Sequence, residues 1–132
     1  MGQGSIIGYE INEKTCQISF YNEKDLEPDT LEVDTDNYQI PLIIGKLRDT
    51  WAYGKEAKRL VTIKDGFTAT RLLSKSLAGD KIEFGEETYD AVWLLSQFIQ
   101  MSLQSFPEID GIVFTVPSLS EEMAQMLRGI AR

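Results

Sequence analysis

The sequence predicts a mixed α/β fold in which helices cover a sheet. A long amphipathic pattern spans about Glu87 to Phe106, and a mostly apolar stretch from Gly111 to Pro117 follows it. A second helical pattern then runs to the end of the chain. An apolar strand between two helices is typical of a sheet that helices cover. The 132 residues suit one domain with a real core, so we expect a single domain from residue 6 onward.

Composition excludes several classes of function. The formal net charge of −8 repels nucleic-acid phosphates and anionic membranes, so neither is an expected partner. The chain has no histidine, which removes the usual general base and metal ligand. We therefore predict no catalytic residue. The single cysteine, Cys16, fits a cytoplasmic protein and a buried position. No apolar run approaches the roughly 18 residues of a membrane span.

The first fifth of the chain predicts a hairpin. Residues 6–11 are mostly apolar and residues 12–14 fit a turn. Cys16, Ile18 and Phe20 then alternate with polar residues, as in a half-buried strand. Residues 1–5 are small and flexible, either a loose terminus or a remnant of cloning.

The acid-rich stretch from Glu23 to Asp36 predicts a solvated loop. A calcium loop needs a glycine that the Asp34-Thr35-Asp36 segment does not supply. We expect instead a short strand at Leu31 and Val33 within this loop.

The middle of the chain predicts further strands and one short helix. Residues 38–44 read as a strand in which Pro41 marks an edge or a bulge. Residues 50–54 are its predicted hairpin partner, and Gly54 opens a helical turn from Lys55 to Leu60. A turn at Asp65-Gly66 precedes a short helix over residues 68–77, with Leu72 and Leu73 facing inward.

The last third predicts a small hairpin and two helices. Residues 81–84 and 87–89 flank a turn at Gly85-Glu86. The final helix starts after Pro117, capped by Ser118 with Glu121 or by Ser120. The long helix and the final helix each present an apolar stripe to the core: Val92, Leu95, Phe98, Ile99 and Leu103 on the first, and Met123, Leu127 and Ile130 on the second. Three aromatic residues form either a binding patch or part of the core: Trp51, Tyr53 and Trp93.

Four segments, taken in order, match one known arrangement. They are Gly8 to Phe20, Ile40-Pro41 with Tyr53 to Arg59, Lys81 to Tyr89, and Ile112 to Pro117 with the helix to Ala131. Together they resemble the N-terminal part of the actin-like ATPases, the superfamily of actin, heat-shock seventy chaperones and sugar kinases, and they are closest to the chaperone branch. The resemblance implies a ribonuclease-H-like half-lobe: an antiparallel meander, a helix, a parallel strand and a helix. The strand that ends in Val116-Pro117 is the most specific of the four segments.

The resemblance also implies a phosphate loop in the first hairpin. In this family the loop amides face the phosphates of ATP, and an aspartate holds Mg²⁺ through water. Here the aspartate position carries Glu10, the glycine position carries Asn12, and the two hydroxyl positions carry Glu13 and Lys14. Glutamate adds a methylene, asparagine adds bulk, and Glu13 adds a negative charge beside the phosphates. The alternative is a plain solvated turn at residues 12–14.

Two interpretations follow. The first is the N-terminal subdomain of a divergent actin-like ATPase-fold protein, with a degenerate phosphate loop and no activity alone. The second phosphate loop and the adenosine pocket of the family would lie beyond Arg132, so ATP and Mg²⁺ are expected only in a longer parent chain. The second interpretation is a non-catalytic interaction or scaffold module that reuses the fold. The expected partner is the rest of the parent chain, another protein, or a second copy joined through exposed sheet edges.

Overall fold

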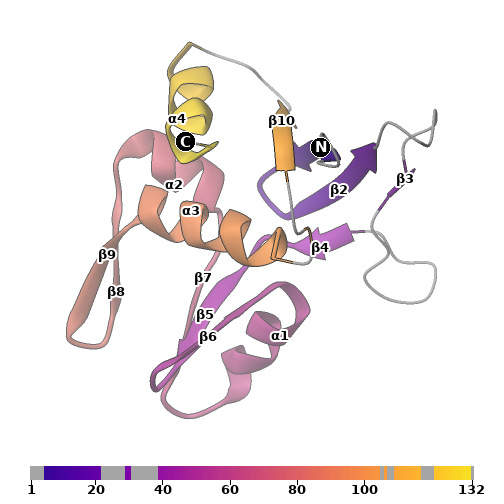
Figure 1. Cartoon of the computed structure of the whole chain (residues 1–132). Coiled ribbons are helices and arrows are strands. Elements are labelled where there is room, and N and C mark those ends of the chain that lie inside the picture. The colour runs from indigo at the N-terminus through magenta and orange to yellow at the C-terminus, as the bar shows by residue number, and fades with distance from the viewer. Residues whose placement is uncertain are drawn as a thin grey trace.

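A computed structural model gives the protein a mixed α/β fold, as predicted, with antiparallel and parallel strands in one sheet and helices packed against it (Figure 1). The structure describes residues 5–21, 29–30, 39–104, 106, 109–116 and 121–131. The predicted strand at Leu31 and Val33, most of the acid-rich loop, and the capping serines Ser118 and Ser120 lie outside the described residues.

The largest sheet joins the two ends of the described chain. Its strands are β1 (Ser5–Ile11), β2 (Thr15–Tyr21), β3 (Asp29–Thr30), β4 (Gln39–Pro41) and β10 (Ile109–Thr115). The order is β10-β1-β2-β3, and β4 also pairs with β2. Strands β1 and β2 form the predicted antiparallel hairpin, and β10 lies parallel to β1 with Gly8 opposite Val113. The opening hairpin and the closing strand therefore lie side by side in one sheet.

Helices cover one face of this sheet, and among the described residues the opposite face carries exposed side chains. Alternation along β1 buries Ile7, Tyr9 and Ile11 completely, and these residues join the core of α3 (Ala91–Ser102) and α4 (Glu121–Ala131). On the opposite face Ile6 is 48% exposed and Val113 is 60% exposed. The period-two pattern of a half-buried strand thus holds for both β1 and β10.

A second sheet carries the middle of the chain. It consists of β5 (Ile44–Leu47), β6 (Thr50–Tyr53) and β7 (Gly66–Ala69), with α1 (Gly54–Arg59) and a 3-10 turn (Leu60–Thr62) beside it. Residues 50–54 were expected to pair with residues 38–44, but the partner of β6 is β5, which shares only Ile44 with that range. Gly54 has a φ of +62°, and a Cβ there would lie 2.8 Å from Cγ2 of Ile40, so this position requires glycine.

The predicted single strand over residues 38–44 is wrong, because the chain changes sheets within it. Strand β4 ends at Pro41, and β5 starts at Ile44 in the other sheet. The amide of Leu42 donates to the carbonyl of Lys14 (2.8 Å), and the amide of Gly54 donates to the carbonyl of Ile43 (2.9 Å), so each side of the break is held by a different element. Pro41 lies on an edge strand, as expected.

The predicted helix over residues 68–77 begins later than expected. Residues Thr68 and Ala69 belong to β7, and α2 spans Leu72–Ala78. Leu72 and Leu73 are buried, as predicted. Arg71 precedes the helix with a φ of +53°, a left-handed conformation that separates the strand from the helix.

The residues from Glu87 to Asp90 belong to the small hairpin and not to the long helix. Strands β8 (Lys81–Phe84) and β9 (Glu87–Asp90) form the predicted hairpin, so α3 begins at Ala91. Of the predicted stripe, Leu95, Phe98, Ile99 and Leu103 are buried. Val92 is 38% exposed, which contradicts the prediction, because it lies on the flank of the stripe in the first turn, and Leu94 takes its place in the core.

The final helix presents its predicted face to the core. Met123 and Leu127 are buried and Ile130 packs against them at the edge. Among the residues that the structure describes, no helix is long and apolar enough to cross a bilayer.

Candidate functional site

The turn between β1 and β2 lies at the edge where the parallel strands β1 and β10 end. Glu10 is exposed, and its neighbours in the sheet are Gln17 on β2 and Thr115 on β10. In open α/β sheets, ligands bind outside the carboxyl ends of parallel strands. The predicted metal-side carboxylate therefore stands at an edge of the sheet that a ligand can reach.

Asn12 closes this turn on itself. Its side-chain Oδ1 accepts hydrogen bonds from the amides of Lys14 (2.8 Å) and Thr15 (2.9 Å). The backbone amide of Asn12 donates to the backbone carbonyl of Thr15 (2.9 Å). Asparagine is favoured in such turns because its side chain replaces a backbone acceptor. The Lys14 amide, which belongs to the phosphate loop that the resemblance implies, and the Thr15 amide next to it are thus already bonded within the turn.

The side chains of Glu13 and Lys14 differ in their surroundings. The Glu13 carboxylate accepts a hydrogen bond from Oγ of Ser74 on α2 (3.1 Å), which ties the turn to that helix. The Lys14 side chain is exposed. In the described part of the chain, no three acidic or cysteine side chains gather in a way that could hold a metal ion directly. A water-mediated role for Glu10 needs only its single carboxylate.

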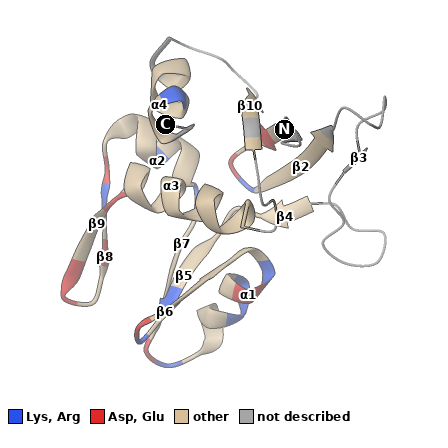
Figure 2. Cartoon of the chain, viewed as in Figure 1, with Lys and Arg blue, Asp and Glu red and all other residues tan. Residues whose placement is uncertain are grey.

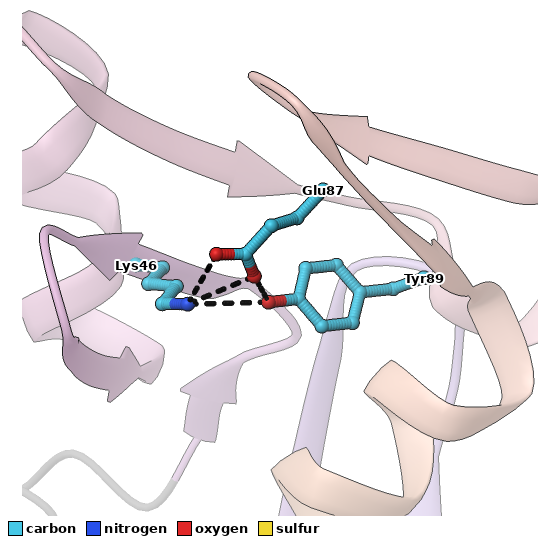
Figure 3. Close-up of polar contacts among 3 residues, drawn as sticks. All are labelled: Lys46, Glu87 and Tyr89. Carbon is cyan, nitrogen blue, oxygen red and sulfur yellow. Dashed lines mark hydrogen bonds and ion pairs between the residues drawn. The ribbon is translucent and has the colours of Figure 1, made fainter.

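A second group of polar side chains connects β5 to the β8–β9 hairpin (Figure 3). Lys46 Nζ lies 3.1 Å from Oε2 of Glu87 and 3.2 Å from the hydroxyl oxygen of Tyr89, and this hydroxyl donates to the Glu87 carboxylate. The hydrogen bonds to Tyr89 and Glu87 raise the pKa of Lys46, and those from Tyr89 and Lys46 lower the pKa of Glu87. Both shifts favour the charged forms, so the three groups hold the hairpin against β5.

Aromatic rings surround this polar group. Trp51 lies 5.4 Å from Tyr89 and 5.6 Å from Trp93 between ring centroids, and Nζ of Lys46 lies 5.2 Å from the Trp51 ring. Trp51 and Trp93 therefore belong to one partly exposed aromatic cluster. Tyr53, the third residue of the predicted patch, packs against Phe98 in the core instead.

A cavity of about 250 Å³ opens next to Lys46. No sequence pattern predicts this cavity, because its lining residues come from three separate segments and form no local motif. The nearest signal was the aromatic set of Trp51 and Trp93, since the Trp51 ring lies 6.1 Å from the ring of the lining residue Phe84. The lining residues are Lys46, Arg48, Asp65, Phe67, Phe84 and Glu87.

Cys16 is buried in the core, as the sequence predicted. It is 1% exposed, and burial raises its pKa to about 12. Its thiol lies 3.6 Å from the hydroxyl oxygen of Tyr9, which in turn lies 2.6 Å from Oγ of Ser102 on α3. A neutral, enclosed thiol is a structural residue rather than a nucleophile.

Comparison with known proteins gives one family. A family model described as "Family of unknown function (DUF5716) C-terminal" matches residues 27–132. The matched span contains the cavity beside Lys46 and every element from β3 to α4, but not the turn at residues 12–14. A search of curated proteins finds no match.

Proposed function

This chain belongs to the DUF5716 C-terminal family, and we propose that it forms a ribonuclease-H-like subdomain of a divergent actin-like ATPase-fold protein, closest to the chaperone branch. The observation that carries the proposal is the parallel pairing of β10 with β1, next to the antiparallel β1–β2 hairpin. The helix α3 precedes β10 and α4 follows it, which is the order of elements that the resemblance implies. We place the protein in the cytoplasm because its one cysteine is a reduced, buried thiol.

The geometry of the first turn supports a degenerate phosphate loop. Glu10 is exposed near the carboxyl ends of β1 and β10 and could anchor the water shell of Mg²⁺. The amides of Lys14 and Thr15 are occupied by Asn12, so they bind a phosphate only if the Asn12 side chain turns away. Glu13 places a second carboxylate at the same turn. We therefore expect weak nucleotide binding and no hydrolysis by this chain alone.

Titration with ATP and Mg²⁺ tests this proposal, best in the longest natural polypeptide that contains the chain. Replacing Asn12 with glycine frees two amide donors, so Asn12→Gly is expected to tighten Mg–ATP binding by about tenfold, the value of one or two charge-assisted hydrogen bonds. Glu10→Ala is expected to remove the dependence on Mg²⁺. Lys58→Ala, an exposed cation on α1, is the control. Silence of the wild type and of Asn12→Gly at millimolar nucleotide would exclude a nucleotide site.

A second function is favoured by the way the turn is closed. The Asn12 and Glu13 contacts make the turn a fixed part of the fold, and Ile6 and Val113 leave apolar surface on the open sheet face. These features suit a non-catalytic interaction or scaffold module whose partner is another protein, the rest of a longer chain or a second copy. Full activity of a Glu10→Ala, Lys14→Ala double variant in the cell would favour this function. Light scattering at high concentration tests self-association, and a strict monomer would count against the second copy.

A further inference from the structure

The cavity beside Lys46 has an unpaired cation and an unpaired anion at neighbouring positions. Strands β5 and β7 are antiparallel with Leu47 opposite Gly66, and Arg48 and Asp65 are the residues that directly follow β5 and directly precede β7. Both side chains are exposed and line the cavity. Across the part of the chain that the structure describes, neither has a hydrogen bond or an ion pair with another residue. The cavity therefore has one cationic and one anionic lining residue that are not paired with each other.

The backbone at both positions is in an unfavourable region. Arg48 has a φ of +58° and Asp65 a φ of +69°, and these are two of the three described non-glycine residues with positive φ. A left-handed conformation is uncommon for arginine, and such strain gathers at ligand sites.

The wall of the cavity is apolar and fixed. The rings of Phe67 and Phe84 stack with centroids 5.7 Å apart and an interplanar angle of 17°. Phe84 is buried while Phe67 is 38% exposed, so one aromatic surface faces the opening. Gly85 makes this approach possible, because a Cβ there would lie 3.2 Å from the tip of the Phe67 ring. Lys46, which is held by Glu87 and Tyr89, also lines the cavity.

We propose that this cavity binds a small α-amino acid with an apolar or aromatic side chain. In such a molecule the carboxylate and the ammonium group sit on the same carbon, which matches the neighbouring charges of Arg48 and Asp65. The carboxylate pairs with Arg48, the ammonium group pairs with Asp65, and the side chain lies on Phe67. A cavity of about 250 Å³ is below the usual range for drug-sized ligands, so it admits a free amino acid but no large cofactor. The proposal stands apart from any nucleotide site at the β1–β2 turn.

Charge in this region differs from that of the whole chain, which favours a ligand with both signs. Figure 2 shows acidic residues at the tip of the β8–β9 hairpin and basic residues on β5 and α1. The cavity has two basic and two acidic residues among its lining: Lys46, Arg48, Asp65 and Glu87. A purely anionic ligand would leave Asp65 and Glu87 facing a like charge, and a purely cationic ligand would do the same to Lys46 and Arg48.

Fluorescence of Trp51 tests the proposal. The chain has two tryptophans, so Trp93→Phe leaves Trp51 as the single reporter, 6.1 Å from the Phe84 ring between centroids. The probes are phenylalanine, 3-phenylpropionate, which lacks the ammonium group, and 2-phenylethylamine, which lacks the carboxylate. A ligand with about a dozen heavy atoms is expected to bind with a Kd of about 1 mM or below. Each analogue is expected to bind at least about tenfold more weakly than phenylalanine.

Two variants that remove one charge each assign the roles of Arg48 and Asp65. Arg48→Gln is expected to weaken phenylalanine and 3-phenylpropionate about tenfold and to leave 2-phenylethylamine unchanged. Asp65→Asn, in which asparagine tolerates the left-handed backbone, is expected to weaken phenylalanine and 2-phenylethylamine and to leave 3-phenylpropionate unchanged. Lys58→Ala is the control for an exposed cation away from the cavity. Circular dichroism confirms that each variant is folded.

Three outcomes would overturn the proposal. The first is the absence of a saturable change with phenylalanine up to about 20 mM, well above the expected Kd. The second is equal binding of all three probes, which would indicate an apolar surface without charge recognition. The third is a variant at Arg48 or Asp65 that binds every probe as Lys58→Ala does, which would make these residues ordinary solvated turn residues.

Discussion

A chain of three buried hydrogen bonds links β1 to the last turn of α3, and its direction can be assigned. Oγ of Ser102 donates its single proton to the carbonyl of Ile99 (2.8 Å). The Tyr9 hydroxyl must therefore donate to Oγ of Ser102 (2.6 Å), and the thiol of Cys16 donates to the Tyr9 oxygen (3.6 Å). Burial raises the pKa of Tyr9 well above its usual value, so the phenol stays protonated. Each group except Ile99 depends on the next for its acceptor.

This direction predicts unequal costs for removing the two hydroxyls. Tyr9→Phe removes a donor and leaves Ser102 its bond to Ile99, so it should cost about 1 kcal/mol, the net value of one hydrogen bond. Ser102→Ala leaves the Tyr9 hydroxyl without an acceptor at a site that is 0% exposed, so it should cost about 2 kcal/mol. The double variant should cost about 1 kcal/mol less than the sum, because the orphaned hydroxyl is then absent.

Urea unfolding followed by circular dichroism measures these costs. Ser96→Ala is the matched control, because Ser96 lies on the same helix and has no hydrogen bond within the described structure. It also corrects for the gain of about 0.5 kcal/mol from the higher helix propensity of alanine. An unchanged urea slope would show that the compactness of the unfolded state is the same. Equal stability of Ser102→Ala and Ser96→Ala, or a larger cost for Tyr9→Phe than for Ser102→Ala, would refute the assigned direction.

Two further predictions concern titratable groups. The pKa of Glu87 is lowered in the fold, so its contribution to stability is complete above its ordinary value of about 4.3 and is lost as the pH falls through the folded value. The difference in unfolding free energy between wild type and Glu87→Gln should therefore be constant above about pH 5 and shrink at lower pH. Glu83→Gln, at an exposed position, is the control. A difference that does not change with pH would contradict this prediction. The raised pKa and burial of Cys16 predict that a thiol reagent at about pH 8 labels it only through global unfolding, so labelling should accelerate with urea as unfolding does. Rapid, complete labelling of the folded protein would show that the thiol is accessible.

The sequence was sufficient for the elements whose pattern is local. A mostly apolar run predicted β1, alternation of apolar and polar residues predicted β2, and the polar residues 12–14 predicted the turn between them. The parallel partner of β1 came from the resemblance rather than from the pattern of residues 111–117, because an apolar strand does not specify its neighbour. Each of these predictions depended on residues close together in the chain or on a known order of elements.

The sequence was insufficient where distant residues decide the outcome. The apolar run around Pro41 gives no local sign that the chain changes sheets, since the break is fixed by bonds from Leu42 to Lys14 and from Gly54 to Ile43. The contact of Lys46 with Glu87 joins positions 41 residues apart, so no spacing rule could find it. The cavity depends on that contact and on the ends of β5 and β7, and it forms only when the β8–β9 hairpin packs against the β5–β7 sheet.

The pairing of Gly8 with Val113 has a consequence for synthesis. During translation the first hairpin leaves the ribosome while its parallel partner, about a hundred residues later, is still unmade. Until β10 arrives, the outer edge of β1 presents unpaired amides and carbonyls to any strand nearby. Closure of this sheet is then a late, long-range event that sets the pace of folding, and a nascent chain stalled before Ile109 should be the form most dependent on chaperones.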